Sequence, residues 1–264
     1  MKKGFSQLCL SQPLSIRESL KLAKGLGYSG LEILLTEKGD LNLNSSKKDY
    51  EGLRALSAET GVEYCSICGS VQYDASLTSN DPKARQRGEE LIGKMLEAAA
   101  ALGVNAVLVI PGRVTEQVPY DVAYDRALEG IMGLVDAAEK HKVTIALEDV
   151  WNRMLLSPLE FRGFIDEVGS DYVGAYFDVG NIVIYGYPEQ WIDILGKRIK
   201  KVHFKDFKRH GYEWKQLMEG DVNWKLVMDA LKRAGYDDYV ITEVEGDEAA
   251  FRKTSELIDK ILKL

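Results

Sequence analysis

The feature that most constrains the fold of this chain is a short unit that recurs along it. In each copy a helix-like stretch ends at a glycine, and a short run of apolar, β-branched or aromatic residues follows within a few positions. Glycine suits the left-handed conformation that commonly ends a helix, and the run that follows has the composition of a strand. The clearest copies begin at Gly27, Gly61, Gly103 and Gly235. Repeated αβ units predict a parallel sheet covered by helices.

Extending this pattern over the 264 residues gives eight strands, separated by helical patterns such as 85–102 and 118–140. Eight αβ units are the number that closes a barrel, and about 250 residues is the usual length of one. We therefore predict an α/β protein with one domain over residues 1–264, a (β/α)8 TIM barrel. An open, doubly wound sheet is the alternative. The predicted strands are 3–8, 30–35, 62–67, 105–110, 143–148, 173–178, 200–205 and 238–243.

Two familiar motifs occur in the wrong structural context. Residues 25–30 spell G-x-G-x-x-G, but they follow a helix and precede a strand, the reverse of the order in a dinucleotide-binding turn. Cys65 and Cys68 form a C-x-x-C near the end of a predicted strand, whereas the thioredoxin motif opens a helix. We interpret both cysteines as core or pocket-rim residues, with a redox or zinc role as the alternative.

Polar residues that can bind a metal stop four of the apolar runs. Active sites of such barrels lie at the C-terminal ends of the strands, so these side chains are expected to converge. Three carboxylates and one imidazole make a hard, oxygen-rich site that suits one divalent ion, Mn(II), Mg(II) or Co(II), and would also accept Zn(II). A helix cap or an ion pair is the alternative for any one of them. The four residues are Glu148, Asp178, His203 and Glu243.

With these residues in place, the chain resembles the xylose-isomerase-like barrel superfamily, in its sugar-phosphate isomerase and epimerase branch. That branch includes ketose 3-epimerases and pentulose-5-phosphate 3-epimerases. The resemblance implies that the same four residues hold the metal, and that Glu148 and Glu243 are catalytic groups on the two sides of the sugar carbon. The stretches that carry it are 147–152, 177–181, 202–206, 219–224 and 242–243.

The implied activity is a metal-dependent sugar or sugar-phosphate epimerase that transfers a proton through an enediolate, at C3 of a ketose or ketose phosphate. Returning the proton to the neighbouring carbon would instead give an aldose-ketose isomerase, such as a hexulose-6-phosphate isomerase. Loss of hydroxide would give a dehydratase of a polyol or keto-sugar, and a barrel that only binds sugar is a further alternative. The superfamily also contains abasic-site endonucleases, which need more than the three histidines of this chain.

Six residues near these motifs are candidates for contact with substrate. Arg209 matches an arginine that family members place over substrate oxygens, with an exposed loop arginine as the alternative. Lys205 and Asp206 lie in the His203 motif and could equally form a surface ion pair. Trp151 and Asn152 follow Glu148 and are expected to line the pocket, although Trp151 also suits a core.

The sixth candidate, Asn181, marks a departure from the best-known free-ketose epimerases. They carry a histidine at this position and a further glutamate where this chain has Met154. Asparagine after Asp-x-Gly occurs in the phosphosugar branch, which favours a ketose phosphate.

The composition limits the classes of molecule that are expected to bind this chain. The formal net charge of −7 disfavours nucleic acid, and residues 1–7 lack the apolar stretch of a signal peptide or membrane span. We expect a cytoplasmic protein with a small-molecule sugar or sugar phosphate as partner and no membrane partner. The resemblance leaves a homo-oligomer open.

Overall fold

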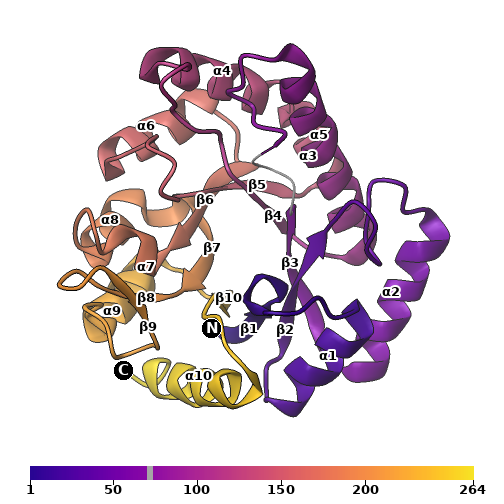
Figure 1. The fold of residues 1–264 in the computed structure, drawn as a ribbon, viewed down its shortest axis with the longest axis vertical. Helices are drawn as coiled ribbons and strands as arrows, with labels where there is room; N and C mark the ends of the chain where they lie inside the picture. The colour runs from indigo at the N-terminus through magenta and orange to yellow at the C-terminus, as the bar shows by residue number, and fades with distance from the viewer. Residues whose placement is uncertain (70–73) are drawn as a thin grey trace.

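The eight predicted strands are present and form a closed parallel barrel in a computed structural model that describes residues 1–69 and 74–264 (Figure 1). Around the barrel the strand order is β1-β10-β7-β6-β5-β4-β3-β2, so β1 pairs with both β2 and β10 and leaves no open edge. The closed ring excludes the open-sheet alternative. The barrel strands are β1 (Lys2–Ser6), β2 (Gly30–Leu35), β3 (Glu63–Gly69), β4 (Ala106–Val109), β5 (Thr144–Glu148), β6 (Val173–Asp178), β7 (Ile199–Phe204) and β10 (Tyr239–Thr242).

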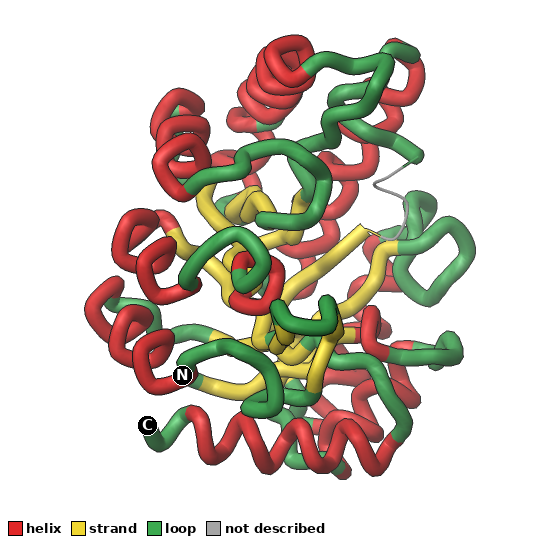
Figure 2. The backbone as a smooth tube through the Cα atoms, turned by 60° about the vertical axis from the view of Figure 1, so that its left-hand side comes forward, coloured by secondary structure: helices red, strands yellow, loops and turns green. Residues whose placement is uncertain are grey.

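Helices surround this ring on the outside (Figure 2). The predicted helix 85–102 begins earlier, at Pro82, because Asp81 accepts a hydrogen bond from the amide of Lys83 and caps it. The predicted helix 118–140 is two helices, interrupted at Gly133 and the buried Leu134. The helices are α1 (Ile16–Gly25), α2 (Lys47–Thr60), α3 (Pro82–Leu102), α4 (Tyr120–Met132), α5 (Val135–His141), α6 (Pro158–Val168), α7 (Val179–Ile182), α8 (Pro188–Leu195), α9 (Trp224–Ala234) and α10 (Glu248–Ile261), with 3-10 turns at Gln7–Cys9 and Gly196–Arg198.

The glycines that punctuate the sequence behave as predicted. Gly27, Gly61, Gly103 and Gly235 all have φ between 73° and 79°, in the left-handed region, and three of them cap the helix before a barrel strand. The G-x-G-x-x-G stretch lies between the end of α1 and the start of β2, as expected.

The apolar core has two parts. The larger part fills the space between the barrel and its helices. The smaller part lies inside the barrel and includes Cys65, Ala106, Leu108, Tyr176 and Ile241. Because alternate residues of a strand face opposite sides, strands such as β3, β4, β5, β6 and β10 contribute residues to both parts.

A short antiparallel hairpin follows β7 at the C-terminal end of the barrel. Its strands are β8 (Asp206–Lys208) and β9 (Glu213–Lys215), and Phe207 pairs with Trp214 in its register. This hairpin is an addition to the repeated αβ pattern, and it determines the shape of the site described below.

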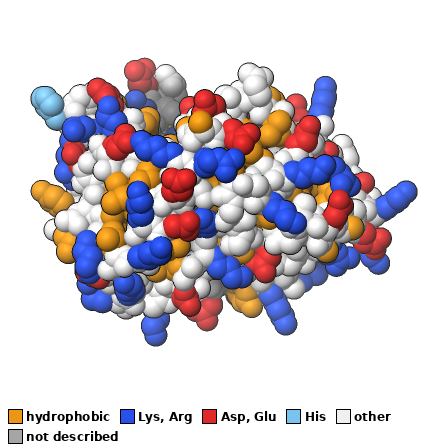
Figure 3. Space-filling view, turned by 90° about the horizontal axis from the view of Figure 1, so that it is seen from below, with side chains coloured by type: hydrophobic (Ala, Val, Ile, Leu, Met, Phe, Trp, Pro, Cys, Tyr) orange, Lys and Arg blue, Asp and Glu red, His pale blue; other side chains and the backbone are white. Residues whose placement is uncertain are grey.

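The surface is of mixed charge. On the face seen in Figure 3, Lys and Arg side chains are interspersed with Asp and Glu side chains. Ion pairs such as Lys253 with Glu219 and Arg252 with Glu248 contribute to this pattern. Within the described residues, no helix has both the length and the apolar character needed to span a membrane.

Candidate metal centre

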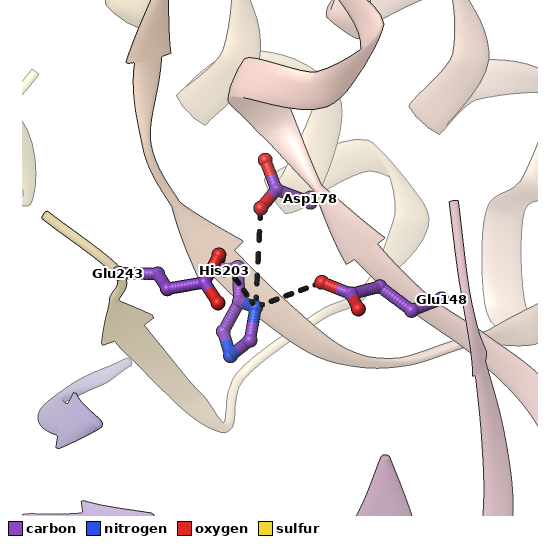
Figure 4. A group of neighbouring side chains, drawn as sticks. All are labelled: Glu148, Asp178, His203 and Glu243. Carbon is purple, nitrogen blue, oxygen red and sulfur yellow. Dashed lines mark hydrogen bonds and ion pairs between the residues drawn. The ribbon is translucent and has the colours of Figure 1, made fainter. Parts of the chain in front are cut away.

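Four neighbouring strands bring the four predicted ligands together (Figure 4). One oxygen or nitrogen from each of Glu148, Asp178, His203 and Glu243 lies within 4.8 Å of the others. The carboxylates surround Nδ1 of His203, at 3.2 Å for Glu148, 3.9 Å for Asp178 and 3.8 Å for Glu243. Ends of parallel strands meet on one rim, so residues far apart in sequence can form this group.

Asp178 illustrates how local structure aims a ligand. It ends β6 and caps α7, because its Oδ1 accepts a hydrogen bond of 2.9 Å from the amide of Asn181. Its other oxygen, Oδ2, is buried and has no hydrogen-bond partner within residues 1–69 and 74–264. A buried carboxylate oxygen without a hydrogen bond, aimed at other ligand-type groups, fits a site for a cation.

The burial and the charges of these four residues also favour a bound cation. Burial raises the pKa of Glu148 to about 7, and the charge of Glu243 acts in the same direction. Burial also raises the pKa of Asp178. Burial disfavours a charged His203, but the charges of Glu32 and Glu243 outweigh it and raise the pKa of His203 well above its usual range. Three crowded carboxylates thus favour a positive charge among them, and the donor set fits a divalent ion.

A fifth polar residue, Glu32, contacts the group from inside the barrel. It was not predicted from the sequence. Its Oε1 lies 3.1 Å from Nε2 of His203, and it also accepts hydrogen bonds from Ser6 and Tyr176. Burial acts to raise the pKa of Glu32, but the charge of His203 and these hydrogen bonds lower it to about 2. The available signal was a glutamate in the middle of an otherwise apolar strand.

A pocket opens beside Glu148 and Glu243, two of the four predicted ligands. A section of about 270 Å³ contacts Glu148, Trp151, Asn181 and Glu243, and a neighbouring section shares Lys205 and Trp214 with it. Trp214, on β9, stacks on Trp151 with ring centroids 4.9 Å apart, and the Lys205 ammonium lies 4.7 Å from the Trp214 ring centroid. Trp214 was not predicted, because nothing in the sequence indicates that β9 folds back over the barrel.

Residues 20–261 match the family described as xylose isomerase-like TIM barrel. The chain belongs to this family. A match of 27% identity over 235 residues, covering 88% of this chain and 83% of the relative, is with the L-ribulose-5-phosphate 3-epimerase UlaE of Salmonella paratyphi A.

Solved structures share this fold at low sequence identity. D-psicose 3-epimerase with D-tagatose, from Clostridium cellulolyticum H10, gives a TM-score of 0.83 at 16% identity and covers 99% of both chains. The IolI protein with a binding zinc atom gives 0.80 at 19% identity, covering 100% of this chain and 98% of its own. These structures show the shared fold, and the match with L-ribulose-5-phosphate 3-epimerase UlaE confirms the resemblance to the epimerase branch.

Against this family background, the six substrate-contact candidates divide into two groups. Trp151, Asn181 and Lys205 line the pocket. The indole of Trp151 also donates to the carbonyl of Asn181, and the Asn181 amide donates to the carbonyl of Asp149, so both side chains are held in place. Lys205 pairs with Glu243 and lies 3.6 Å from Asp178 Oδ2. Their contact with substrate stays a prediction.

The other three candidates make contacts within the protein. Asn152 donates to the carbonyl of Gly112. Asp206 accepts hydrogen bonds from the amides of Phe207, Met218 and Val222 and from the indole of Trp224, which secures the loop of the 219–224 motif. Arg209 donates to the carbonyls of Val183 and Gly186 and lies over the ring of Tyr187. The structure does not bring these three into the pocket.

The cysteines match the core interpretation. Cys9, Cys65 and Cys68 are all buried, and none of the three forms a disulfide in the described chain. Cys65 and Cys68 lie on β3, and Cys68 reaches the pocket wall.

Proposed function

We propose that this chain is a divalent-metal-dependent sugar epimerase that inverts C3 of a ketose or a ketose phosphate. The observation that carries the proposal is the pair of glutamates. Glu148 and Glu243 come from β5 and from the end of β10, and both face the space beside Nδ1 of His203. A relative named L-ribulose-5-phosphate 3-epimerase supports a ketose 5-phosphate as substrate, as does Asn181 after Asp-x-Gly.

The proposed chemistry is a proton transfer between two bases. One glutamate removes the proton from C3, and the C–H electrons form the C2–C3 double bond of an enediolate while the C2=O π electrons move to O2. The other glutamate, which is protonated, then delivers its proton to the opposite face of C3 as the C2=O bond re-forms. A bound divalent ion would supply Lewis-acid stabilisation of the negative charge on the substrate oxygens. Glu148, Asp178, His203 and Glu243 would hold it, and the oxygen-rich set suits Mn(II), Mg(II) or Co(II), with Zn(II) also accepted.

The pocket wall supplies the remaining features of a sugar site. The Trp214 indole is 45% exposed and presents an apolar surface next to the Lys205 ammonium. Such a wall can pack against the C–H face of a sugar while the ammonium donates to a hydroxyl. We assign Trp151, Trp214 and Lys205 this role.

The test is incubation of the Mn(II)-loaded protein in D2O with a panel of ketoses and ketose 5- or 6-phosphates, followed by NMR. Deuterium at C3 together with the epimer is the expected result. Deuterium at C1 or C2 with an aldose product would make the protein an aldose-ketose isomerase, and loss of hydroxide would make it a dehydratase. No exchange with any panel member would refute the proposal.

Two variants examine the two-base mechanism directly. Glu148→Gln and Glu243→Gln should each abolish epimerisation, yet each should keep solvent exchange at C3 for the one epimer whose proton faces the remaining glutamate. Metal content is measured for each variant, since both residues are proposed ligands. Glu63→Gln, at the opposite end of the barrel, is the matched control and should epimerise normally. Retained epimerisation in both variants contradicts the mechanism.

A further inference from the structure

A hydrogen-bonded chain crosses the interior of the barrel below the four ligands. Glu32 on β2 meets His203 on β7, although β1 and β10 stand between these strands in the barrel order (Figure 1). Tyr176 on β6 and Ser6 on β1 complete the chain. All four side chains are fully buried.

Glu32 occupies a position that apolar packing would ordinarily fill. Its strand neighbours Leu31 and Ile33 are fully buried, as Glu32 is. A carboxylate in such surroundings is costly unless both of its oxygens have partners. Both do: Oε1 accepts from the Ser6 hydroxyl at 2.7 Å and faces His203 Nε2 at 3.1 Å, and Oε2 accepts from the Tyr176 hydroxyl at 2.5 Å.

These contacts determine how the imidazole of His203 is presented. Because the carboxylate of Glu32 accepts, the proton shared with it belongs to Nε2 of His203. Nδ1 is then the nitrogen whose lone pair is free, and it is the nitrogen that faces Glu148, Asp178 and Glu243. The Tyr176 ring packs on the imidazole at 4.5 Å between centroids, which restricts rotation of the imidazole.

We propose that Glu32 is a positioning residue of the metal centre, which fixes the tautomer and orientation of His203 so that Nδ1 binds the ion. Carboxylates that hold a ligating histidine in this way raise its basicity, and their loss typically weakens metal binding by about 10- to 100-fold. The inference rests on the metal site of the proposed function and is independent of which sugar is the substrate.

The first measurement is the dissociation constant for Mn(II), free of any substrate, together with the visible absorption spectrum of the Co(II) form. Glu32→Gln keeps the shape of the side chain but replaces one acceptor oxygen by a donor. We expect it to weaken Mn(II) binding about 10- to 100-fold and to change the Co(II) spectrum. Glu63→Gln is the control, because Glu63 also accepts from a tyrosine hydroxyl, that of Tyr239, but at the other end of the barrel. It should bind both ions as the unaltered protein does.

The second measurement reads the tautomer itself. The chain has three histidines, so nitrogen NMR of the Zn(II)-loaded protein gives few signals, and His141→Gln and His210→Gln identify the two that are not His203. In the unaltered protein the Nε2 of His203 should carry the proton and Nδ1 should carry none. Glu32→Gln should lose this single tautomer.

If Glu32→Gln does not fold, Tyr176→Phe and Ser6→Ala test the same chain from its other partners. Each leaves the carboxylate in place with one hydrogen bond fewer, and we expect Mn(II) binding to weaken about 3-fold or more. Unchanged Mn(II) affinity in Glu32→Gln, or in both hydroxyl variants when Glu32→Gln is unfolded, overturns the positioning role alone. Failure of the unaltered protein to bind any of these ions overturns the proposed function and this inference with it.

Discussion

Replacing Gly180 by alanine probes how closely α7 packs against Lys205, the residue that follows β7, beside the proposed metal ligands. Gly180 lies in α7, two residues after Asp178, and a methyl group there would point at the backbone of Lys205. Its added Cβ would lie 2.7 Å from Cβ of Lys205 and 2.9 Å from the carbonyl carbon and oxygen of Lys205. Alanine suits a helix, so only this contact opposes the change.

The size of the effect follows from these distances. Carbon atoms in contact are normally about 3.5–4.0 Å apart, so α7 and the segment at Lys205 must separate by about 1 Å. Overpacking of this kind costs about 1–3 kcal/mol, against which alanine recovers about 0.5–1 kcal/mol of helix propensity. We expect the free energy of unfolding to fall by about 1–2 kcal/mol. The same shift draws Asp178 away from His203, and Mn(II) affinity should fall by about 10-fold, the low end of the range for disturbed ligand orientation.

Urea unfolding followed by circular dichroism, in the presence of EDTA, measures the stability change without a contribution from metal. A Mn(II) titration of the folded protein measures the affinity. Gly163→Ala is the matched control, since Gly163 is an exposed glycine within α6 and its added Cβ would meet no atom within 4 Å. It should leave Mn(II) affinity unchanged and stability equal or slightly higher. If Gly180→Ala binds Mn(II) and unfolds as the unaltered protein does, the close-contact reasoning is wrong.

Three further predictions concern the pocket, the barrel floor and the metal. Trp214→Ala should raise the KM for the best ketose about 5- to 10-fold without changing Mn(II) affinity, as steady-state kinetics and a titration can check. Asp238→Asn leaves the ammonium of Lys201, 1% exposed, without its ion-pair partner and should lower the free energy of unfolding by about 2 kcal/mol at pH 7. Burial acts to raise the pKa of Asp238, but the charge of Lys201 outweighs burial and the pKa is lowered. The loss of unfolding free energy caused by Asp238→Asn, measured with urea, therefore has its full size above about pH 4. It decreases as the pH falls through the lowered pKa of Asp238. Removal of metal by EDTA should abolish turnover and lower Tm, and added Mn(II) should restore both.

The architecture was readable from the sequence because its signals are local. A glycine with positive φ, such as Gly103, ends a helix whatever lies around it, and an apolar run such as 106–109 then has to be buried. Eight repeats of this unit leave a closed barrel as the natural solution. The break between α4 and α5 at Gly133 was not predicted, because a helix tolerates an isolated glycine and a single glycine therefore does not indicate a break.

The grouping of the four proposed metal ligands also followed from the sequence, since the direction of a parallel strand carries each strand-end residue to the same rim. No such rule covers contacts across the barrel or between loops. Glu32 reaches His203 only because the barrel closes in this register, and Trp214 reaches Trp151 only because the hairpin folds back. Likewise, Asp206 and Arg209 are polar residues of a recognisable motif whose hydrogen bonds are taken by nearby loop backbone. Local pattern thus determined the fold and the grouping of the four proposed ligands, whereas tertiary packing decided which other side chains meet them.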